Sequence, residues 1–132
     1  MIQATELRLN NYVKYNGIVM YVTSIESPKP RKEKRFDGKY IIELFDGTGF
    51  ITATTDQIDG IDLTEELLLG SGFDYYYDGT MILKSFVIDL ISYDILHEDS
   101  WIASEIKHLH QLQNLYFVIT QKELQINLHN QK

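Results

Sequence analysis

Three short turn motifs interrupt the first two thirds of this chain, and they constrain its fold more than any other feature. They are Asn16-Gly17, Asp46-Gly47-Thr48-Gly49 and Asp78-Gly79. Asparagine, aspartate and glycine tolerate the positive φ that tight hairpin turns require. The residues beside these motifs are rich in β-branched and aromatic side chains, which favour strands. The pattern predicts antiparallel strands joined by tight turns.

The N-terminal part is expected to be a curved, β-rich structure. Residues 7–26 read as a hairpin or meander about Asn16-Gly17, and the strands 40–45 and 50–54 follow. Short strands with glycine-containing turns suit a small barrel or a strongly curved sheet. An SH3-like arrangement is one candidate, and other meanders are equally compatible. Further strands are expected at 74–77, 81–90, 91–96 and 101–103.

A short helix of about two turns is predicted in the middle of the chain. Thr64 or Asp62 can accept the first backbone hydrogen bonds of this helix, and Gly70 or Gly72 can end it. The pair Leu67-Leu68 is expected to face inward.

A longer C-terminal helix is predicted from about Ser104 to Ile119. Its apolar residues recur at spacings of three and four, at Ile106, Leu109, Leu112, Tyr116 and Ile119. Beyond it, Leu124, Ile126 and Leu128 alternate with polar residues as in a half-buried strand. The predicted fold is therefore α+β, with the C-terminal helix packed on the sheet. We expect a single domain, 1–132, with possible subdomains 1–60 and 61–132.

Composition excludes several classes of protein. The chain has 132 residues, 44% of them hydrophobic and 23% charged, as in soluble globular proteins. It has no cysteine, so disulfides, thiolate metal sites and cysteine nucleophiles are excluded. The first residues lack the pattern of a signal peptide, and no apolar run approaches the ~20 residues of a membrane span. We expect a cytoplasmic protein.

The net charge of −7 is unevenly distributed. Residues 29–39 contain six of the twelve basic residues and two acidic ones, whereas the rest of the chain is strongly acidic. A broad nucleic-acid-binding face is therefore not expected. The basic loop is the best candidate for binding an anion, through Arg31, Lys32, Lys34 and Arg35. A solvated loop between two strands is the simpler interpretation.

The run Tyr75-Tyr76-Tyr77 is the second candidate binding feature. On a strand, Tyr75 and Tyr77 would share one face and Tyr76 would point to the other. Aromatic rings suit partner interfaces and base stacking, and they suit sheet packing equally well.

Nothing in the sequence favours an enzyme, and we predict no catalytic residue, metal site or cofactor. There is no Gly-x-Ser-x-Gly motif, phosphate loop or dinucleotide fingerprint. The four histidines lack the spacing of a zinc-protease helix. A small hydrolase using His97 with Asp94, Glu98 or Asp99 is the weakest of the alternatives.

The C-terminal segment carries a resemblance to a protein family. His110-Gln111-Leu112-Gln113-Asn114-Leu115-Tyr116-Phe117, with Lys122-Glu123-Leu124, resembles the ending of small uncharacterised proteins frequent in Bacteroidetes genomes and their phages. The segments Glu6–Val13 and Ile61–Phe73 agree with this resemblance. The relatives carry glycine where this chain has Gln121, and the proline-containing basic insertion at 28–35 is particular to it.

The resemblance implies a shared fold and a phage or mobile-element origin, and it supplies no activity. The leading hypothesis is a non-enzymatic binding protein that acts by occupying a host protein. The acidic body of this chain would mimic nucleic acid or steer the chain toward a basic partner. The alternative is a protein that sequesters a nucleotide-like anion, held by the basic loop and the tyrosines.

Overall fold

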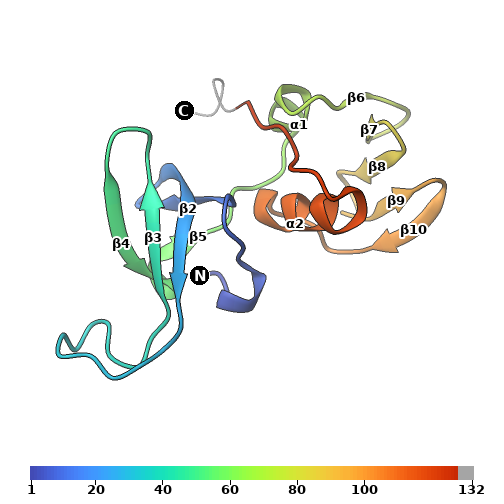
Figure 1. Cartoon of the computed structure of the whole chain (residues 1–132). Coiled ribbons are helices and arrows are strands. Elements are labelled where there is room, and N and C mark those ends of the chain that lie inside the picture. The colour runs from blue at the N-terminus through green and yellow to red at the C-terminus, as the bar shows by residue number, and fades with distance from the viewer. Residues whose placement is uncertain (128–132) are drawn as a thin grey trace. The chain divides into compact units, whose positions relative to one another are not determined.

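The structure, a computed structural model, describes residues 1–127 and has an α+β fold (Figure 1). The chain divides into two compact units, Met1–Ile61 and Asp62–Lys132. The division predicted from the sequence, between residues 60 and 61, lies one residue from this boundary.

The first unit is a curled, antiparallel half-barrel. Its elements are the 3₁₀ turn η1 (Ala4–Glu6), β1 (Tyr12–Tyr15), β2 (Ile18–Glu26), β3 (Ile41–Phe45), β4 (Phe50–Thr54), the 3₁₀ turn η2 (Thr55–Gln57) and β5 (Ile58–Asp59). The strand order is β4-β3-β2-β1-β5. A flat sheet of five strands would put its two edge strands ~19 Å apart, but the four steps from Thr54 to Ile58 span at most ~14 Å. The sheet must therefore curl, as in the SH3-like arrangement considered from the sequence.

The predicted Asn16-Gly17 turn joins β1 to β2. Asn16 has φ 50° and Gly17 has φ 76°, so both central residues are left-handed, as a type I′ turn requires. A bulge between Val22 and Ser24 bends β2 and adds to the curl. Alternate side chains then fill the core of this unit, which comprises Ile2, Val13, Met20, Val22, Ile42, Leu44, Ala53 and Ile58.

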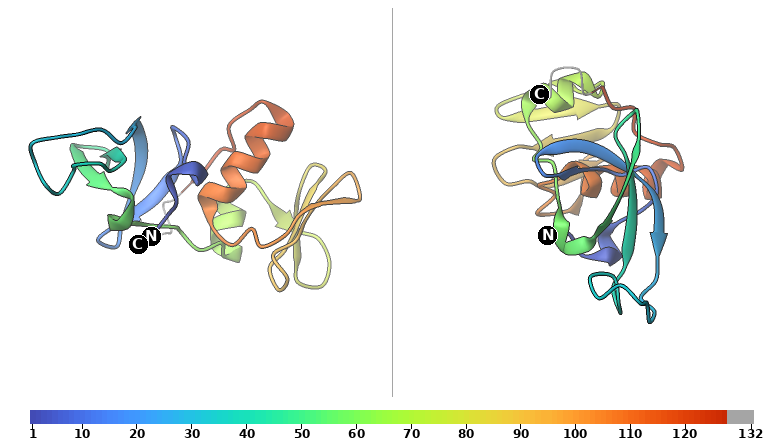
Figure 2. Two further views of the ribbon diagram at one scale, coloured as in Figure 1. Left: turned by 90° about the horizontal axis from the view of Figure 1, so that it is seen from below. Right: turned by 90° about the vertical axis from the view of Figure 1, so that its left-hand side faces the viewer.

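The second unit combines an antiparallel meander with two helices. Its elements are α1 (Glu65–Gly70), β6 (Asp74–Tyr75), β7 (Thr80–Leu83), β8 (Phe86–Asp89), β9 (Ile95–His97), β10 (Ser100–Ala103) and α2 (Leu109–Thr120). The strand order β10-β9-β8-β7-β6 follows the chain, so each strand pairs with its sequence neighbour. The ring of Tyr116 on α2 lies 5.1 Å from that of Phe86 on β8, and α2 lies beside the strands in both views of Figure 2.

Helix α1 begins and ends as the sequence predicts. The Thr64 hydroxyl accepts a hydrogen bond from the Leu67 amide at 3.1 Å. After the last turn, Gly72 adopts φ 94°, and the Phe73 amide donates to the Leu68 carbonyl at 2.9 Å. This bond closes a Schellman motif, which needs a left-handed residue at the Gly72 position.

Helix α2 begins at Leu109, five residues later than predicted. Glu105 is left-handed, at φ 57°, and the next residues bond to other segments instead of to a helical turn. The Ile106 amide donates to the Tyr93 carbonyl at 3.0 Å, and the Lys107 carbonyl accepts from the Leu63 amide at 2.9 Å. These tertiary hydrogen bonds outweigh the helical periodicity of the segment.

The apolar stripe predicted for this helix is only partly correct. Leu109, Leu112 and Tyr116 are buried, as predicted, but Ile119 is exposed and Ile106 precedes the helix. No strand follows within residues 121–127, although Leu124 is buried; Leu128 lies outside the described residues.

Candidate binding site

The tyrosine run lies mostly in a turn. Strand β6 ends at Tyr75, which pairs with Met81 of β7. The following turn is closed by the Thr80 amide, which donates to the Tyr77 carbonyl at 2.8 Å. Because the turn includes Tyr76 and Tyr77, the predicted strand alternation does not apply to them.

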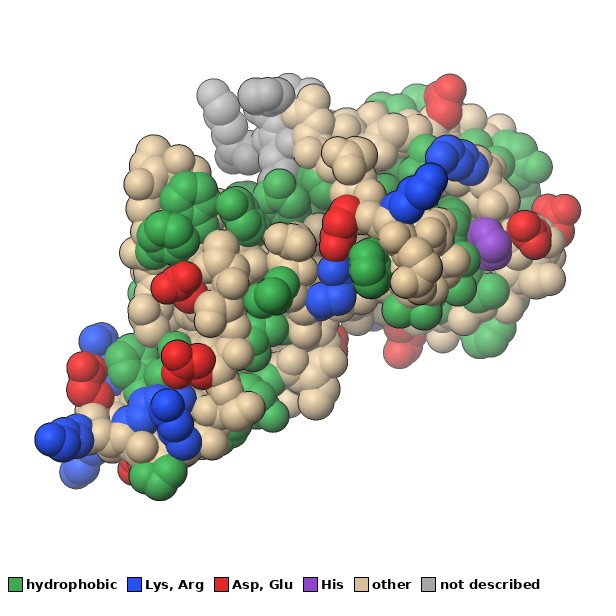
Figure 3. Space-filling view, in the orientation of Figure 1, with side chains coloured by type: hydrophobic (Ala, Val, Ile, Leu, Met, Phe, Trp, Pro, Cys, Tyr) green, Lys and Arg blue, Asp and Glu red, His purple; other side chains and the backbone are tan. Residues whose placement is uncertain are grey.

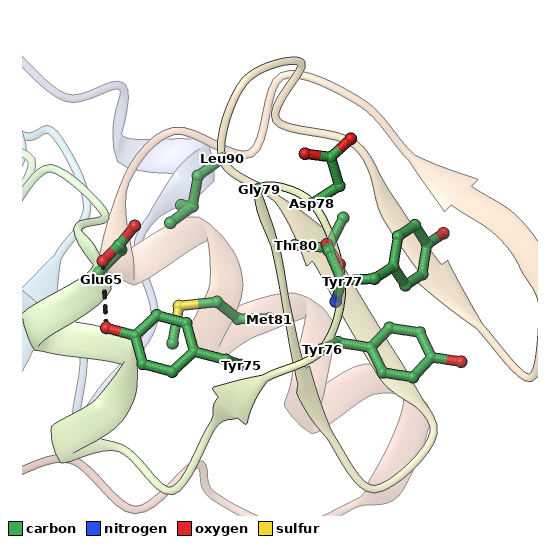
Figure 4. A pocket seen from close by; sticks show the side chains of 9 residues that line it. All are labelled: Glu65, Tyr75, Tyr76, Tyr77, Asp78, Gly79, Thr80, Met81 and Leu90. Atoms are coloured by element: carbon green, nitrogen blue, oxygen red, sulfur yellow. Dashed lines mark hydrogen bonds between the residues drawn. The ribbon is translucent and has the colours of Figure 1, made fainter.

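The prediction that Tyr75 and Tyr77 share a face is therefore wrong. Figure 4 shows the Tyr75 side chain directed toward Glu65 of α1, whereas Tyr76 and Tyr77 point the other way. The rings of Tyr76 and Tyr77 lie side by side, with centroids 4.7 Å apart. The turn thus presents two aromatic surfaces.

A pocket of about 180 Å³ opens beside this turn. Its lining residues are Glu65, Tyr75, Tyr76, Tyr77, Asp78, Gly79, Thr80, Met81 and Leu90. The Tyr75 hydroxyl donates a hydrogen bond to Glu65 Oε2 at 3.2 Å, which links β6 to α1. The amide of Leu90 donates to the Gly79 carbonyl at 3.1 Å and so ties the end of β8 to the turn.

Large apolar side chains remain exposed around this pocket. Tyr75, Tyr76 and Tyr77 are 59%, 52% and 60% exposed, and Ile91 is 80% exposed. A Cβ atom at Gly79 would lie 3.1 Å from the Ile91 side chain, so Ile91 borders the same turn. These four residues, Tyr75, Tyr76, Tyr77 and Ile91, surround one turn and include both of its aromatic surfaces; we call them together the tyrosine surface.

The electrostatic environment of the pocket is negative. The hydrogen bond to the Glu65 carboxylate and the charge of Glu65 raise the pKa of the Tyr75 phenol, and the charges of Asp74 and Glu66 add to this effect. All of these carboxylates oppose formation of a phenolate. None of the residues lining the pocket is a lysine or arginine.

The net charge of the protein is located in the second unit. Residues 1–61 contain eight acidic and eight basic side chains, and so their net charge is zero. Residues 62–132 contain eleven acidic and four basic side chains, which account for the whole net charge of −7. The tyrosine surface thus belongs to a strongly acidic unit.

The basic loop, residues 27–40, belongs to the first unit and extends beyond the ends of β2 and β3 (Figures 1 and 2). Arg31 is directed into this loop and its side chain is only 13% exposed. Its guanidinium donates to the carbonyls of Phe36 and Lys39, both at 3.0 Å, and of Ser27 at 3.2 Å. It also pairs with Glu26 at 3.2 Å. Arg31 therefore braces the loop, and its donors are already engaged.

The other three predicted anion ligands lie on the loop surface. Lys32, Lys34 and Arg35 are exposed, and Lys and Arg side chains gather at this end of the molecule in Figure 3. Arg35 pairs with Glu33 at 3.0 Å and lies 4.5 Å from the Phe36 ring centroid. These three side chains are therefore accessible on the loop, whereas the Arg31 guanidinium is bonded within it.

Sequence reasoning missed Glu65, Met81 and Leu90 as parts of a site. Glu65 lies in the first turn of α1, where a negative charge is favourable, so its presence needed no binding role to explain it. Met81 is a buried apolar residue and is typical of a core position. The sequence signal for Glu65 is its separation of ten residues from Tyr75, with the end of α1 between the two. It indicates proximity only once the chain is known to reverse at Gly72.

The residues of the hydrolase alternative lie elsewhere in the second unit. The His97 ring on β9 lies 4.5 Å from the Phe86 ring, and Glu98 and Asp99 form the turn to β10. Within residues 1–127, no three histidine, aspartate or glutamate side chains are grouped so that they could hold a metal ion.

Comparisons with known protein families, with curated proteins and with solved structures gave no match. In the part of the chain that the structure describes, no helix has the length and apolar character to cross a membrane.

Proposed function

We propose that this protein is a non-enzymatic binding protein that acts by occupying another protein, and that the tyrosine surface makes the contact. The observation that carries the proposal is the exposure of Tyr75, Tyr76, Tyr77 and Ile91 around one turn. Isolated exposed apolar residues are ordinary, whereas grouped ones are typical of interaction sites. Tyrosine is also among the residues enriched in the energetically dominant parts of interfaces.

The charge distribution supports a basic partner. The second unit carries the net charge of −7, so it would attract a positively charged surface and repel nucleic acid. The resemblance of the C-terminal segment supports a phage or mobile-element origin, in which case the partner is a cytoplasmic host protein.

The test is affinity capture from a Bacteroidetes host lysate with the full chain. The wild-type protein should retain a stoichiometric basic partner, and a Tyr76→Ser/Tyr77→Ser variant should lose it. Trp101→Ser is the matched control, because Trp101 is 61% exposed and lies on β10, at the opposite edge of the sheet from β6. Absence of any stoichiometric partner, or equal retention by the tyrosine variant, would contradict the proposal.

The basic loop supports a second candidate, sequestration of a nucleotide-like anion. Lys32, Lys34 and Arg35 are exposed on a loop that Arg31 already holds in place, which lowers the ordering cost of binding. Thermal unfolding with a panel of nucleotides separates the candidates. A ligand at 100 times its dissociation constant would stabilise the chain by ~2.7 kcal/mol, whereas a protein-binding role predicts no shift.

A further inference from the structure

We propose that the pocket lined by Glu65 and Tyr75 receives a single cationic side chain, lysine or arginine, presented by the protein partner. This inference rests on the proposed function and specifies the chemistry that the partner must supply. Three properties of the pocket support it: the groups that line it, its volume, and the charge around it.

The lining groups match the two parts of a long cationic side chain. Figure 4 shows the Glu65 carboxylate, the Tyr75 ring and the side chains of Met81 and Leu90 gathered on one side of the turn. A carboxylate and an aromatic face both attract an ammonium or guanidinium group. The thioether of Met81 and the methyl groups of Leu90 suit the aliphatic stem of lysine or arginine.

The ring of Tyr75 is held ready for this contact. Its backbone pairs with Met81 on β7, and its hydroxyl is bound to Glu65 Oε2 at 3.2 Å. Only one of the two Glu65 carboxylate oxygens is used in that bond, so the other can accept from an incoming cation. Because the ring is already oriented, little side-chain entropy would be lost on binding.

The volume favours one side chain over a cofactor or a nucleotide. At about 180 Å³ the pocket would hold roughly six waters at ~30 Å³ each. Pockets for drug-sized ligands and cofactors usually enclose ~300–1,000 Å³. A single extended side chain is the largest group that this space suits.

The surrounding charge favours a cation and excludes an anion. Asp78 is a second carboxylate in the lining. The charges of Asp74 and Glu66, like that of Glu65, raise the pKa of the Tyr75 phenol. The lysine nearest in sequence, Lys84, lies in the turn at the other end of the β7–β8 hairpin. No lysine or arginine is among the lining residues, so a cation from the partner would meet uncompensated carboxylates there.

The test follows the methyl NMR signal of Met81, a residue only 1% exposed in the lining of the pocket, in the full ¹³C-methionine-labelled chain. The probes are Nα-acetyl-arginine amide and Nα-acetyl-lysine amide, with the neutral Nα-acetyl-citrulline amide as control. We expect a saturable shift with the two cations and none with citrulline. The Glu65→Gln variant should bind about tenfold more weakly, since it removes the charge.

Three further variants separate a specific pocket from a general acidic surface. Glu66→Gln removes the same charge from the same helix turn, outside the pocket lining, and should weaken binding less than about twofold. Tyr75→Leu should weaken it about tenfold, whereas Tyr75→Phe keeps the ring, loses only the hydroxyl bond to Glu65 and should weaken it less. Equal effects of Glu65→Gln and Glu66→Gln, or an equal shift with citrulline, would overturn the inference.

The pocket and the wider surface can fail independently. Partner capture that is lost in Tyr76→Ser/Tyr77→Ser but unchanged in Glu65→Gln would refute the cation pocket and leave the proposed function standing. Saturable binding of the arginine probe, with no stoichiometric partner captured, would support the cation pocket and refute the proposed function. Concentration-dependent dimers that disappear when Lys32, Lys34 and Arg35 are changed to alanine would instead make a second copy of this chain the occupant.

Discussion

Single carboxylates hold several of the turns, and Asp46 shows how. Its Oδ1 atom accepts hydrogen bonds from the amides of Thr48 and Gly49, at 2.8 and 2.9 Å, and from the Thr48 hydroxyl at 2.9 Å. These bonds favour the charged form and lower the pKa of Asp46 below its ordinary value. Asp89 has a lowered pKa for the same reason, through the amides of Ile91 and Ser92.

The lowered pKa of Asp46 predicts acid sensitivity of the β3–β4 turn. A carboxyl with a folded pKa below the unfolded one stabilises the protein above the unfolded pKa, and this contribution disappears as the pH falls through the folded pKa. Stability should therefore decline as the pH is lowered from neutral to below the ordinary aspartate value. Asp46→Asn keeps the Oδ1 acceptor but does not titrate, so its stability should depend less steeply on pH. Urea midpoints measured across this range check the prediction, and identical pH slopes for the two proteins would contradict it.

At the scale of elements, hydrogen bonds between segments decide what the local pattern leaves open. The first turn of α2 is displaced because residues 106 and 107 bond to Tyr93 and Leu63. The basic loop is held by Arg31, whose five acceptors come from residues 26, 27, 29, 36 and 39. Neither arrangement follows from the periodicity or the composition of the segment concerned.

Arg31 should therefore contribute to stability and to loop order, whereas Arg35 should not. Replacing Arg31 by alanine removes the donor of four carbonyls, at residues 27, 29, 36 and 39, and of the Glu26 carboxylate, at a cost of about 1–3 kcal/mol. Arg35→Ala is the matched control: its side chain is 74% exposed, and its ion pair with Glu33 should contribute less than ~1 kcal/mol. Urea unfolding gives the stabilities, and amide exchange of residues 27–40 gives the order of the loop. Equal losses in the two variants would show that Arg31 has no bracing role.

At the scale of the whole molecule, the net charge and the tyrosine surface belong to the same unit. The second unit carries the net charge of −7 together with the tyrosine surface, whereas the first unit is neutral. Long-range attraction by such a charge accelerates encounter with a basic partner and is screened by salt.

Association with the proposed basic partner should accordingly depend on ionic strength. Between low and high salt the association rate should fall on the order of tenfold, because screening removes the steering. The dissociation rate should change much less, since the tyrosine contacts are short-ranged. Stopped-flow mixing with the purified partner measures both rates. An association rate insensitive to salt would show that charge does not guide the encounter.

Local chemistry made much of the fold predictable. Asn16-Gly17 and Asp78-Gly79 form tight turns because their residues accept positive φ, and α1 lies between Thr64 and Gly72 because these residues cap it. Such features depend on near neighbours in the chain, and a pattern of residue types describes them fully. Of the strand predicted at 74–77, only Asp74 and Tyr75 form β6, because the turn includes Tyr76 and Tyr77 as well as Asp78-Gly79.

The candidate site could not be predicted in this way. By itself, the sequence determined the turns at Asn16-Gly17 and Asp78-Gly79, the caps of α1, and an acidic chain with one basic loop. The strand predicted at 81–90 is instead two paired strands, β7 and β8. Only the tertiary structure decided that Glu65 meets Tyr75, that Arg31 turns inward and that α2 begins at Leu109. The physical reason is that hydrogen bonds and burial between segments distant in sequence depend on where the folded chain brings them.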